Sequence, residues 1–187
     1  LSAKIGDYVR EANNTSALIP IYSKFNDNQA LGKIHFQNAA DANLAIARAT
    51  AAKGIWCATS TQDRALFLKI TAQLMRLEKF SLSKLIMIEA GKTKLEALGD
   101  VDEAIDFLNY YATQITNDTD NQKEPYGVFA IISPWNFPLA ILCGMTAAAL
   151  AAGNTVIMKP AEQTPFTAMA LYELFKKARF PPDVIQI

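Results

Sequence analysis

The first part of the chain alternates polar and apolar residues over 33–36, within a stretch, 20–37, that is rich in turn-forming residues. This pattern predicts a short strand or a hairpin. A helical period follows, and it predicts a helix that is capped by Asp41 and ends near Lys53, with Gly54 as its stop.

Three more amphipathic helices are predicted after a connector that begins at Trp56 and Cys57. Their apolar residues recur with the period of an α-helix. We expect them to begin at Thr61, at Ser81 or Ser83, and at about Lys94, and to end near Leu77, Gly91 and Thr113. Gly99 is a weak point in the third helix and a candidate kink. Residues of about 40–115 therefore form a mostly helical segment with little obvious chemistry.

The composition changes after a polar connection at residues 116–124. Apolar strands are predicted at 128–132, at 155–158 and from Val184, with helices at 139–152 and 167–179. The first strand is wholly apolar, which is typical of a strand covered on both faces. The alternating order predicts a parallel, right-handed α/β sheet over about 125–187.

Composition and charge narrow the function classes. The 187 residues include 18 basic and 18 acidic side chains, without the basic cluster that a nucleic-acid-binding face needs. The two cysteines, Cys57 and Cys143, show no metal-ligand spacing, and His35 is an isolated surface or strand histidine, so no metal site is predicted. A reducing, cytoplasmic compartment is expected.

One segment calls for a membrane test, because residues 125–158 carry no Asp, Glu, Lys or Arg. Pro134 and Pro138 break this stretch into pieces shorter than the roughly 20 residues of a spanning helix. A buried strand, loop, helix and strand are favoured instead of a transmembrane segment. The start at Leu1 and the strand-like end at Ile187 lead us to expect a fragment of a longer polypeptide.

Two loops carry the candidate chemistry, at residues 133–137 and 159–163. Ligands bind at the carboxyl ends of parallel strands, so both loops are expected to face one crevice. No Gly-x-Gly-x-x-Gly motif follows these strands, so the usual phosphate cradle is absent. The amide of Asn136 suits a developing oxyanion, and the carboxylate of Glu162 suits ribose hydroxyls. Lys159 adds a cation.

Ordinary structural roles are open for the same residues. Trp135 and Phe137 are also typical of core aromatics, Asn136 of a turn, and Glu162 of a helix start. Cys143 lies in an apolar helix, where a thiol stays protonated and inert.

Taken together, the two loops and their surroundings resemble the aldehyde dehydrogenase superfamily. The resemblance spans roughly residues 17–187, and its most specific stretches are 124–128, 131–139, 147–156 and 159–165. Residues 89–93 and 101–112 narrow it to the Δ1-pyrroline-5-carboxylate (glutamate-γ-semialdehyde) dehydrogenase module of bifunctional proline utilisation A proteins.

The resemblance implies a role for each matching residue. Asn136 is the catalytic amide that holds the oxyanion, and Phe137 flanks the substrate channel. Lys159, Ala161 and Glu162 bind the adenosine ribose side of NAD, and its wall is formed by Ile132, Ser133, Pro134 and Trp135. Glu89 is a structural partner in the helical layer, with substrate contact as the alternative. The family's nucleophilic cysteine and hydrolytic base match no residue here.

These observations predict an aldehyde-dehydrogenase-like α/β fold: a helical layer followed by part of a Rossmann-like parallel sheet, truncated. Residues 1–187 are read as the N-terminal part of the NAD-binding domain, without the catalytic domain. The complete protein is expected to oxidise glutamate-γ-semialdehyde to glutamate with NAD in proline catabolism, as a homo-oligomer, whereas the fragment alone is expected to be inactive. The alternative is a non-catalytic binding or assembly module with the same fold.

Overall fold

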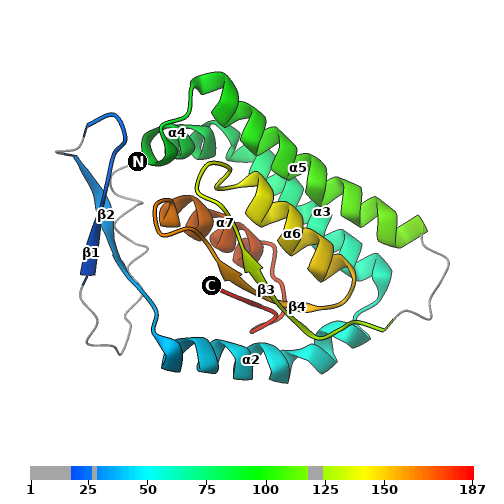
Figure 1. Ribbon diagram of the computed structural model, residues 1–187. Coiled ribbons are helices and arrows are strands. Elements are labelled where there is room, and N and C mark those ends of the chain that lie inside the picture. Colours follow the sequence, from blue (N-terminus) through cyan, green and yellow to red (C-terminus); the bar gives the residue numbers. More distant parts are fainter. Residues whose placement is uncertain (1–17, 27–28, 118–123) are drawn as a thin grey trace.

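A computed structural model describes residues 18–26, 29–117 and 124–187 (Figure 1). The described elements, in chain order, are β1 (Leu18–Tyr22), β2 (Ala30–His35), α2 (Ala39–Ala58), α3 (Thr61–Leu77), α4 (Lys79–Ala90), α5 (Lys94–Asn117), β3 (Val128–Ile132), α6 (Ala140–Ala151), β4 (Thr155–Lys159), α7 (Pro165–Lys177) and β5 (Ile185–Gln186). The predicted order of strands and helices is confirmed. Much of the predicted polar connection, residues 118–123, lies outside the described residues.

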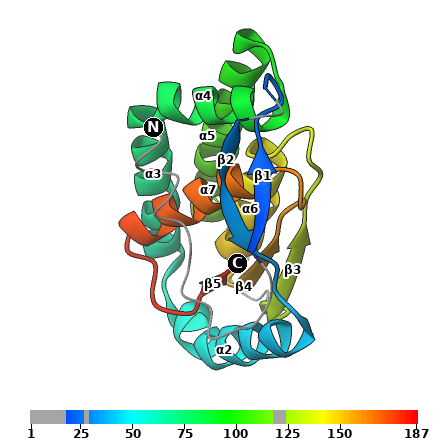
Figure 2. The same cartoon turned by 90° about the vertical axis from the view of Figure 1, so that its left-hand side faces the viewer.

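The predicted hairpin is confirmed as the antiparallel pair β1–β2, which lies beside the rest of the fold (Figures 1 and 2). Its tip is fastened to the helices, because the backbone N–H of Lys24 donates to the carbonyl of Ile88 at 2.9 Å. Ile21 and Leu31 of the hairpin pack against the small cluster of Leu85 and Phe166. The hairpin is thereby joined to α4 and α7.

Helix α2 differs from its prediction at both ends. Asn38 is the cap, and Asp41 completes a capping box by accepting from the Asn38 N–H. Gly54 does not stop the helix, which continues through Trp56. The Trp56 side chain is fully buried and its indole N–H donates to the Leu150 carbonyl at 3.0 Å. Burying such a side chain contributes roughly 1.5–3 kcal/mol, more than the roughly 1 kcal/mol that an interior glycine costs.

Helices α3, α4 and α5 pack against one another on the side of the sheet that α6 covers (Figure 1), and they differ from their predictions only in detail. Helix α3 is capped by Ser60, one residue before the predicted start. Helix α4 begins at Lys79 instead of at a serine, because Ser83 is buried inside it and donates to the Lys79 carbonyl. Gly91 ends α4 as predicted, with a φ of 74° that favours glycine. Helix α5 runs through Gly99 to Asn117.

The parallel sheet has the order β3-β4-β5, as predicted from the alternation of strands and helices. It lies between α2 on one face and α6 on the other (Figure 1). Strand β4 is central and mostly buried, but β3 is an edge strand, and Ile132 is 69% exposed. The prediction that β3 is covered on both faces is therefore wrong for this chain. An apolar pattern shows affinity for a core but does not show whether a strand lies at an edge.

Helix α6 is held at both ends by side chains of the helical layer. At its start, the Ala140 N–H donates to Asp100 of α5 at 2.7 Å. At its end, the guanidinium of Arg64 in α3 donates to the Ala151 carbonyl at 3.0 Å. The following turn is closed by Asn154, whose side chain accepts from the Gly127 N–H before β3. These contacts fix the two strands that carry the candidate loops.

Candidate functional site

The two predicted loops leave the same end of neighbouring strands. Ile132 at the end of β3 pairs with Lys159 at the end of β4, and the Ser133 N–H donates to the Lys159 carbonyl at 3.3 Å. We call residues 133–139 the first turn and residues 159–164 the second turn. The structure thus brings both turns to one edge of the sheet, as the parallel arrangement predicts.

The first turn presents an amide flanked by aromatic side chains. Asn136 is exposed, and its amide makes no hydrogen bond to any other residue that the structure describes. Trp135 and Phe137 are 53% and 40% exposed, so the interpretation of them as core aromatics does not hold in this chain. The ammonium group of Lys92 lies 4.0 Å from the centroid of the Phe137 ring. The amide therefore stands on a supported turn and is free to donate to a ligand.

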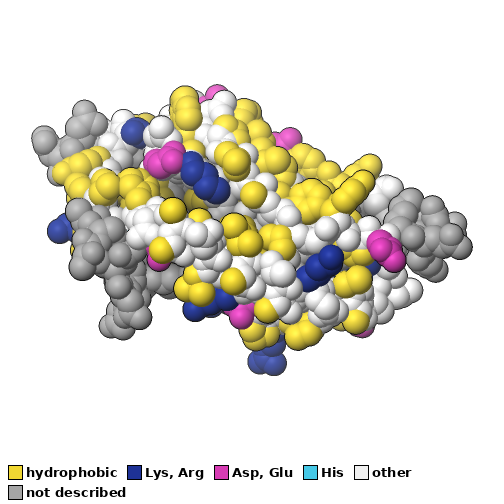
Figure 3. All heavy atoms as spheres, turned by 60° about the horizontal axis from the view of Figure 1, so that its bottom comes forward, with side chains coloured by type: hydrophobic (Ala, Val, Ile, Leu, Met, Phe, Trp, Pro, Cys, Tyr) yellow, Lys and Arg dark blue, Asp and Glu magenta, His cyan; other side chains and the backbone are white. Residues whose placement is uncertain are grey.

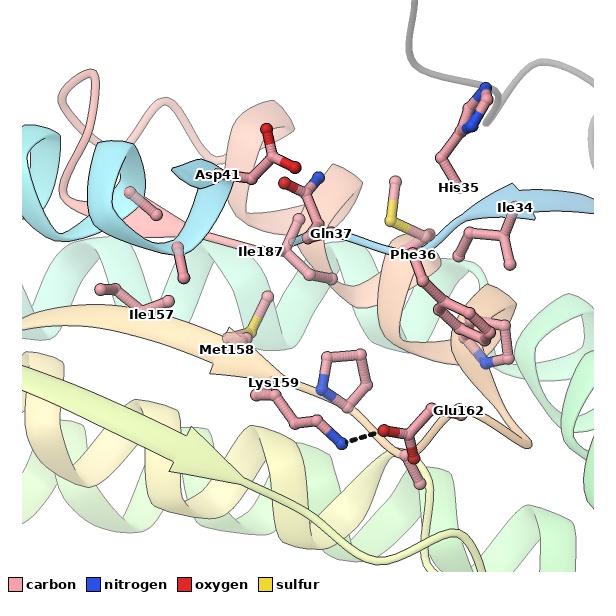
Figure 4. A pocket seen from close by; sticks show the side chains of 16 residues that line it. Ile34, His35, Phe36, Gln37, Asp41, Ile157, Met158, Lys159, Glu162 and Ile187 are labelled. Carbon is pink, nitrogen blue, oxygen red and sulfur yellow. Dashed lines mark hydrogen bonds and ion pairs between the residues drawn. The ribbon is translucent and has the colours of Figure 1, made fainter. Parts of the chain in front are cut away.

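The second turn forms one wall of a pocket of about 470 Å³ (Figure 4). Across the pocket lie the connection from β2 into α2 and the first turns of α2. The pocket is lined by Ile34, His35, Phe36, Gln37, Asp41, Ala42, Ala45, Ile157, Met158, Lys159, Pro160, Ala161, Glu162, Pro165, Met169 and Ile187. Most of these residues are apolar, and the volume lies in the usual range of small-molecule sites.

Lys159 and Glu162 form an ion pair at this wall, and both side chains are about half exposed. The hydrogen bond from the Lys159 ammonium lowers the pKa of the Glu162 carboxyl. Glu162 is therefore ionised at neutral pH and accepts hydrogen bonds only. Part of its accepting capacity is already taken by Lys159.

Apart from Asn136, which lies on the first turn, the predicted site residues divide into three groups. Lys159, Ala161 and Glu162 line the pocket, whereas the residues of the predicted cofactor wall lie beside it on β3 and the first turn: Ile132, Ser133, Pro134 and Trp135. Phe137 instead lines a second hollow, of about 480 Å³, together with acidic side chains of α5. The far wall, residues 34–37 with Asp41, was not predicted, and no motif in the sequence marks it.

Glu89 was expected to be a structural partner, and its contacts show that it is one. It is fully buried in α4 and accepts three hydrogen bonds from the start of α7. Burial raises the pKa of Glu89 to about 7, although the bonds from Thr167 and Phe166 act in the opposite direction. Asp100 is also buried, and it pairs with Lys92 at 2.7 Å.

The cysteines lie away from both turns. Cys143 is buried in α6 next to the Ala104 carbonyl, and burial raises the pKa of its thiol. Cys57 is exposed at the end of α2. Among the residues that the structure describes, no group of three or more His, Cys, Asp or Glu side chains could hold a metal ion. In the same residues, no helix combines the length and apolar character that crossing a bilayer requires.

The charged side chains on one face of the molecule alternate in sign. On the face seen in Figure 3, basic side chains lie scattered among hydrophobic side chains, with acidic ones close to several of them.

Comparisons with known proteins identify the family to which the chain is similar. The model of the aldehyde dehydrogenase family matches residues 9–187. The chain is 43% identical to the bifunctional protein PutA of Klebsiella aerogenes over 169 residues, which cover 90% of this chain and 13% of that protein. The chain thus spans only a small part of this relative.

Solved structures show the same fold. The chain is similar to 1-pyrroline-5-carboxylate dehydrogenase from Thermus with bound NAD, with a TM-score of 0.87 and 33% identity, over 92% of this chain and 36% of that one. It is also similar to NADP-dependent glyceraldehyde-3-phosphate dehydrogenase from Bacillus halodurans complexed with NADP, with a TM-score of 0.86 and 30% identity, over 92% and 40% of the two chains. Neighbours of this fold therefore bind either dinucleotide.

Proposed function

Because the chain belongs to the aldehyde dehydrogenase family, we propose that it is part of an NAD-dependent enzyme that oxidises glutamate-γ-semialdehyde to glutamate in proline catabolism. The observation that carries the proposal is the meeting of two turns at one sheet edge, one with a free amide and the other with a charged pair beside an apolar pocket. The semialdehyde is favoured over other aldehydes by the similarity to PutA and to 1-pyrroline-5-carboxylate dehydrogenase.

The second turn is proposed to hold the adenosine half of NAD. The apolar lining of the pocket suits a purine ring, and its volume is adequate for a bound nucleoside. Glu162 would accept from the ribose hydroxyls, with Lys159 and Ala161 beside it, and Ile132, Ser133, Pro134 and Trp135 would lie along the rest of the cofactor. Bound NAD supplies the hydride acceptor for the oxidation.

The first turn is proposed to act on the aldehyde. When a thiolate adds to the carbonyl carbon, the oxygen becomes an oxyanion, and the Asn136 amide would donate to it without repelling the thiolate. Phe137 would flank the channel by which the aldehyde arrives. We propose that the nucleophilic cysteine and the base that activates water come from other parts of the polypeptide, because Cys143 is buried in α6 and Cys57 lies in the last turn of α2, away from both turns.

Three finer points belong to the same proposal. Residues 1–187 would be the N-terminal part of an NAD-binding domain, with a helical segment of about 40–115 and an α/β segment of about 125–187. The complete protein would be a homo-oligomer. Both cysteines are free, which fits a reducing, cytoplasmic compartment.

The experiment is a substrate panel on the complete polypeptide, with NADH formation as the readout. Glutamate-γ-semialdehyde should show the highest kcat/KM among aldehydes of similar size. A protein that oxidises other aldehydes but not this one would refute the substrate. A protein that oxidises none of them would support a binding or assembly module instead.

A further inference from the structure

The helix that follows the second turn is capped by a distant residue. Pro165 is the first residue of α7 and has no N–H, and the side chain of the N-cap, Thr164, makes no capping bond. The next two N–H groups, of Phe166 and Thr167, donate to the two carboxylate oxygens of Glu89 at 2.6 and 2.8 Å. The Thr167 hydroxyl donates to the same carboxylate. Glu89 thus satisfies the start of α7 from another helix, α4.

The helix that follows the first turn is held in the same way. Its N-cap, Leu139, has no side chain that can accept a hydrogen bond, and the Ala140 N–H donates to one oxygen of Asp100 at 2.7 Å. The other Asp100 oxygen pairs with Lys92 at 2.7 Å. Lys92 in turn lies over the ring of Phe137, within the first turn. Asp100 therefore holds the first turn from both sides: directly at the start of α6, and through Lys92 at Phe137.

Buried carboxylates are costly unless they are bonded, and both of these are almost fully buried. A helix N-terminus can be satisfied at lower cost by a local Ser, Thr, Asp or Asn, as Asn38 does for α2. The two helices that follow the site turns instead use carboxylates from the helical layer. Their position is thereby tied to that layer and not only to the local chain.

We propose that Glu89 and Asp100 are positioning residues, Glu89 for the second turn, which carries Lys159 and Glu162, and Asp100 for the first turn, which carries Asn136. The assignment of each turn to a ligand rests on the proposed function. The positioning itself does not, since it follows from the bonds at the starts of α6 and α7.

The charged groups around the two carboxylates differ. Burial raises the pKa of Glu89, and the charge of Lys24 beside the hairpin lowers it to a smaller extent. Asp100 is paired directly with Lys92, whose side chain is only 12% exposed. Removal of the Asp100 charge should therefore release Lys92 from its ion pair. Removal of the Glu89 charge should instead weaken the hydrogen bonds from the N–H groups at the start of α7.

The test uses the near-isosteric variants Glu89→Gln and Asp100→Asn in the complete polypeptide. For Glu89→Gln, the Kd for NAD should rise about tenfold, as expected when binding must order a turn that has lost one buried bond. Its kcat at saturating NAD should stay within about twofold of wild type. For Asp100→Asn, kcat should fall by about 10- to 100-fold through misplacement of Asn136, with little change in the Kd for NAD.

Leu82→Ala is the matched control, because Leu82 is buried in α4 but makes none of these bonds. This variant should lower the free energy of unfolding, but it should show neither the selective rise in the Kd for NAD expected of Glu89→Gln nor the selective fall in kcat expected of Asp100→Asn. Equal changes of Kd and kcat in Glu89→Gln, Asp100→Asn and Leu82→Ala would show only a structural role and overturn the proposal.

A second readout does not depend on the function. Hydrogen exchange should accelerate about tenfold or more in residues 160–168 of Glu89→Gln and in 133–141 of Asp100→Asn, and not the reverse. If exchange is unchanged, the positioning is refuted even when NAD binds. If exchange accelerates but wild type binds no NAD, only the proposed function fails. Should either variant not fold, Thr167→Val removes the hydroxyl that donates to Glu89, and Lys92→Gln removes the ammonium that pairs with Asp100. Unchanged exchange in the same segments of these variants would also refute the positioning.

Discussion

Three interior glycines allow one substitution to be compared at matched positions. Gly54 in α2, Gly99 in α5 and Gly144 in α6 all lie inside helices. A Cβ atom added at Gly54 or Gly99 would meet no atom within 4 Å. At Gly144, it would lie 2.8 Å from an atom of the Phe107 ring, and two further ring atoms lie at 3.0 and 3.1 Å. Gly144 therefore permits the close approach of α5 and α6.

Replacement by alanine should have opposite effects at these sites. Alanine is favoured over glycine in a helix interior by about 1 kcal/mol, so Gly54→Ala and Gly99→Ala should each stabilise the protein by up to that amount. Overpacking of a close contact typically costs about 1–3 kcal/mol, so Gly144→Ala should be neutral to about 2 kcal/mol less stable. The displaced α6 should also shift the first turn, and the kcat of the complete enzyme should fall.

The assay is denaturant unfolding of the three variants beside wild type, with turnover measured on the same samples. Phe107→Leu in the Gly144→Ala background should recover much of the loss, because the smaller side chain leaves room for the new methyl group. If Gly144→Ala proves as stabilising as Gly99→Ala, the close α5–α6 contact does not limit the packing, and the reasoning is refuted.

Four further outcomes are expected. In the complete enzyme, Asn136→Ala should lower kcat by about 10²–10³ with little change in the Kd for NAD, and a sharp rise in that Kd at constant kcat would contradict its role. The kcat/KM for NAD should exceed that for NADP, because a 2′-phosphate beside the Glu162 carboxylate is repelled, and Glu162→Gln should reduce this difference. Equal kcat/KM values for the two cofactors in wild type would refute the role of Glu162 at the ribose. Purified residues 1–187 should form no NADH from the semialdehyde, since neither Cys143, which is buried, nor Cys57, at the end of α2, serves as the nucleophile and no residue matches the hydrolytic base; measurable NADH would contradict this. The raised pKa of Glu89, from 4.5 to about 7, should make the contribution of this residue to the free energy of unfolding largest below pH 4.5, and about 3 kcal/mol of that contribution should be lost as pH rises through 7. Glu89→Gln should flatten that dependence, and an equal slope in both proteins would show that another group titrates.

Local signals predicted most elements, and failed where a distant contact outweighed them. The strands and most helix limits follow from periods that repeat within a few residues. Gly54 was a reasonable stop signal, but the burial of Trp56 against α6 keeps α2 helical beyond it. Likewise, the apolar run of β3 predicted a strand correctly but not its place at the edge of the sheet.

The sequence by itself determined the order of the elements and the two turns, because the polar residues of each turn directly follow a strand. It also placed Lys159 and Glu162 close enough along the chain to pair. Only the tertiary structure decided that Glu89 accepts from the N–H of Phe166, 77 residues later, at the start of α7, and that residues 34–37 face the second turn across the pocket. Periodicity and capping act between near neighbours in the chain, whereas these contacts depend on how whole helices pack, which no local pattern encodes.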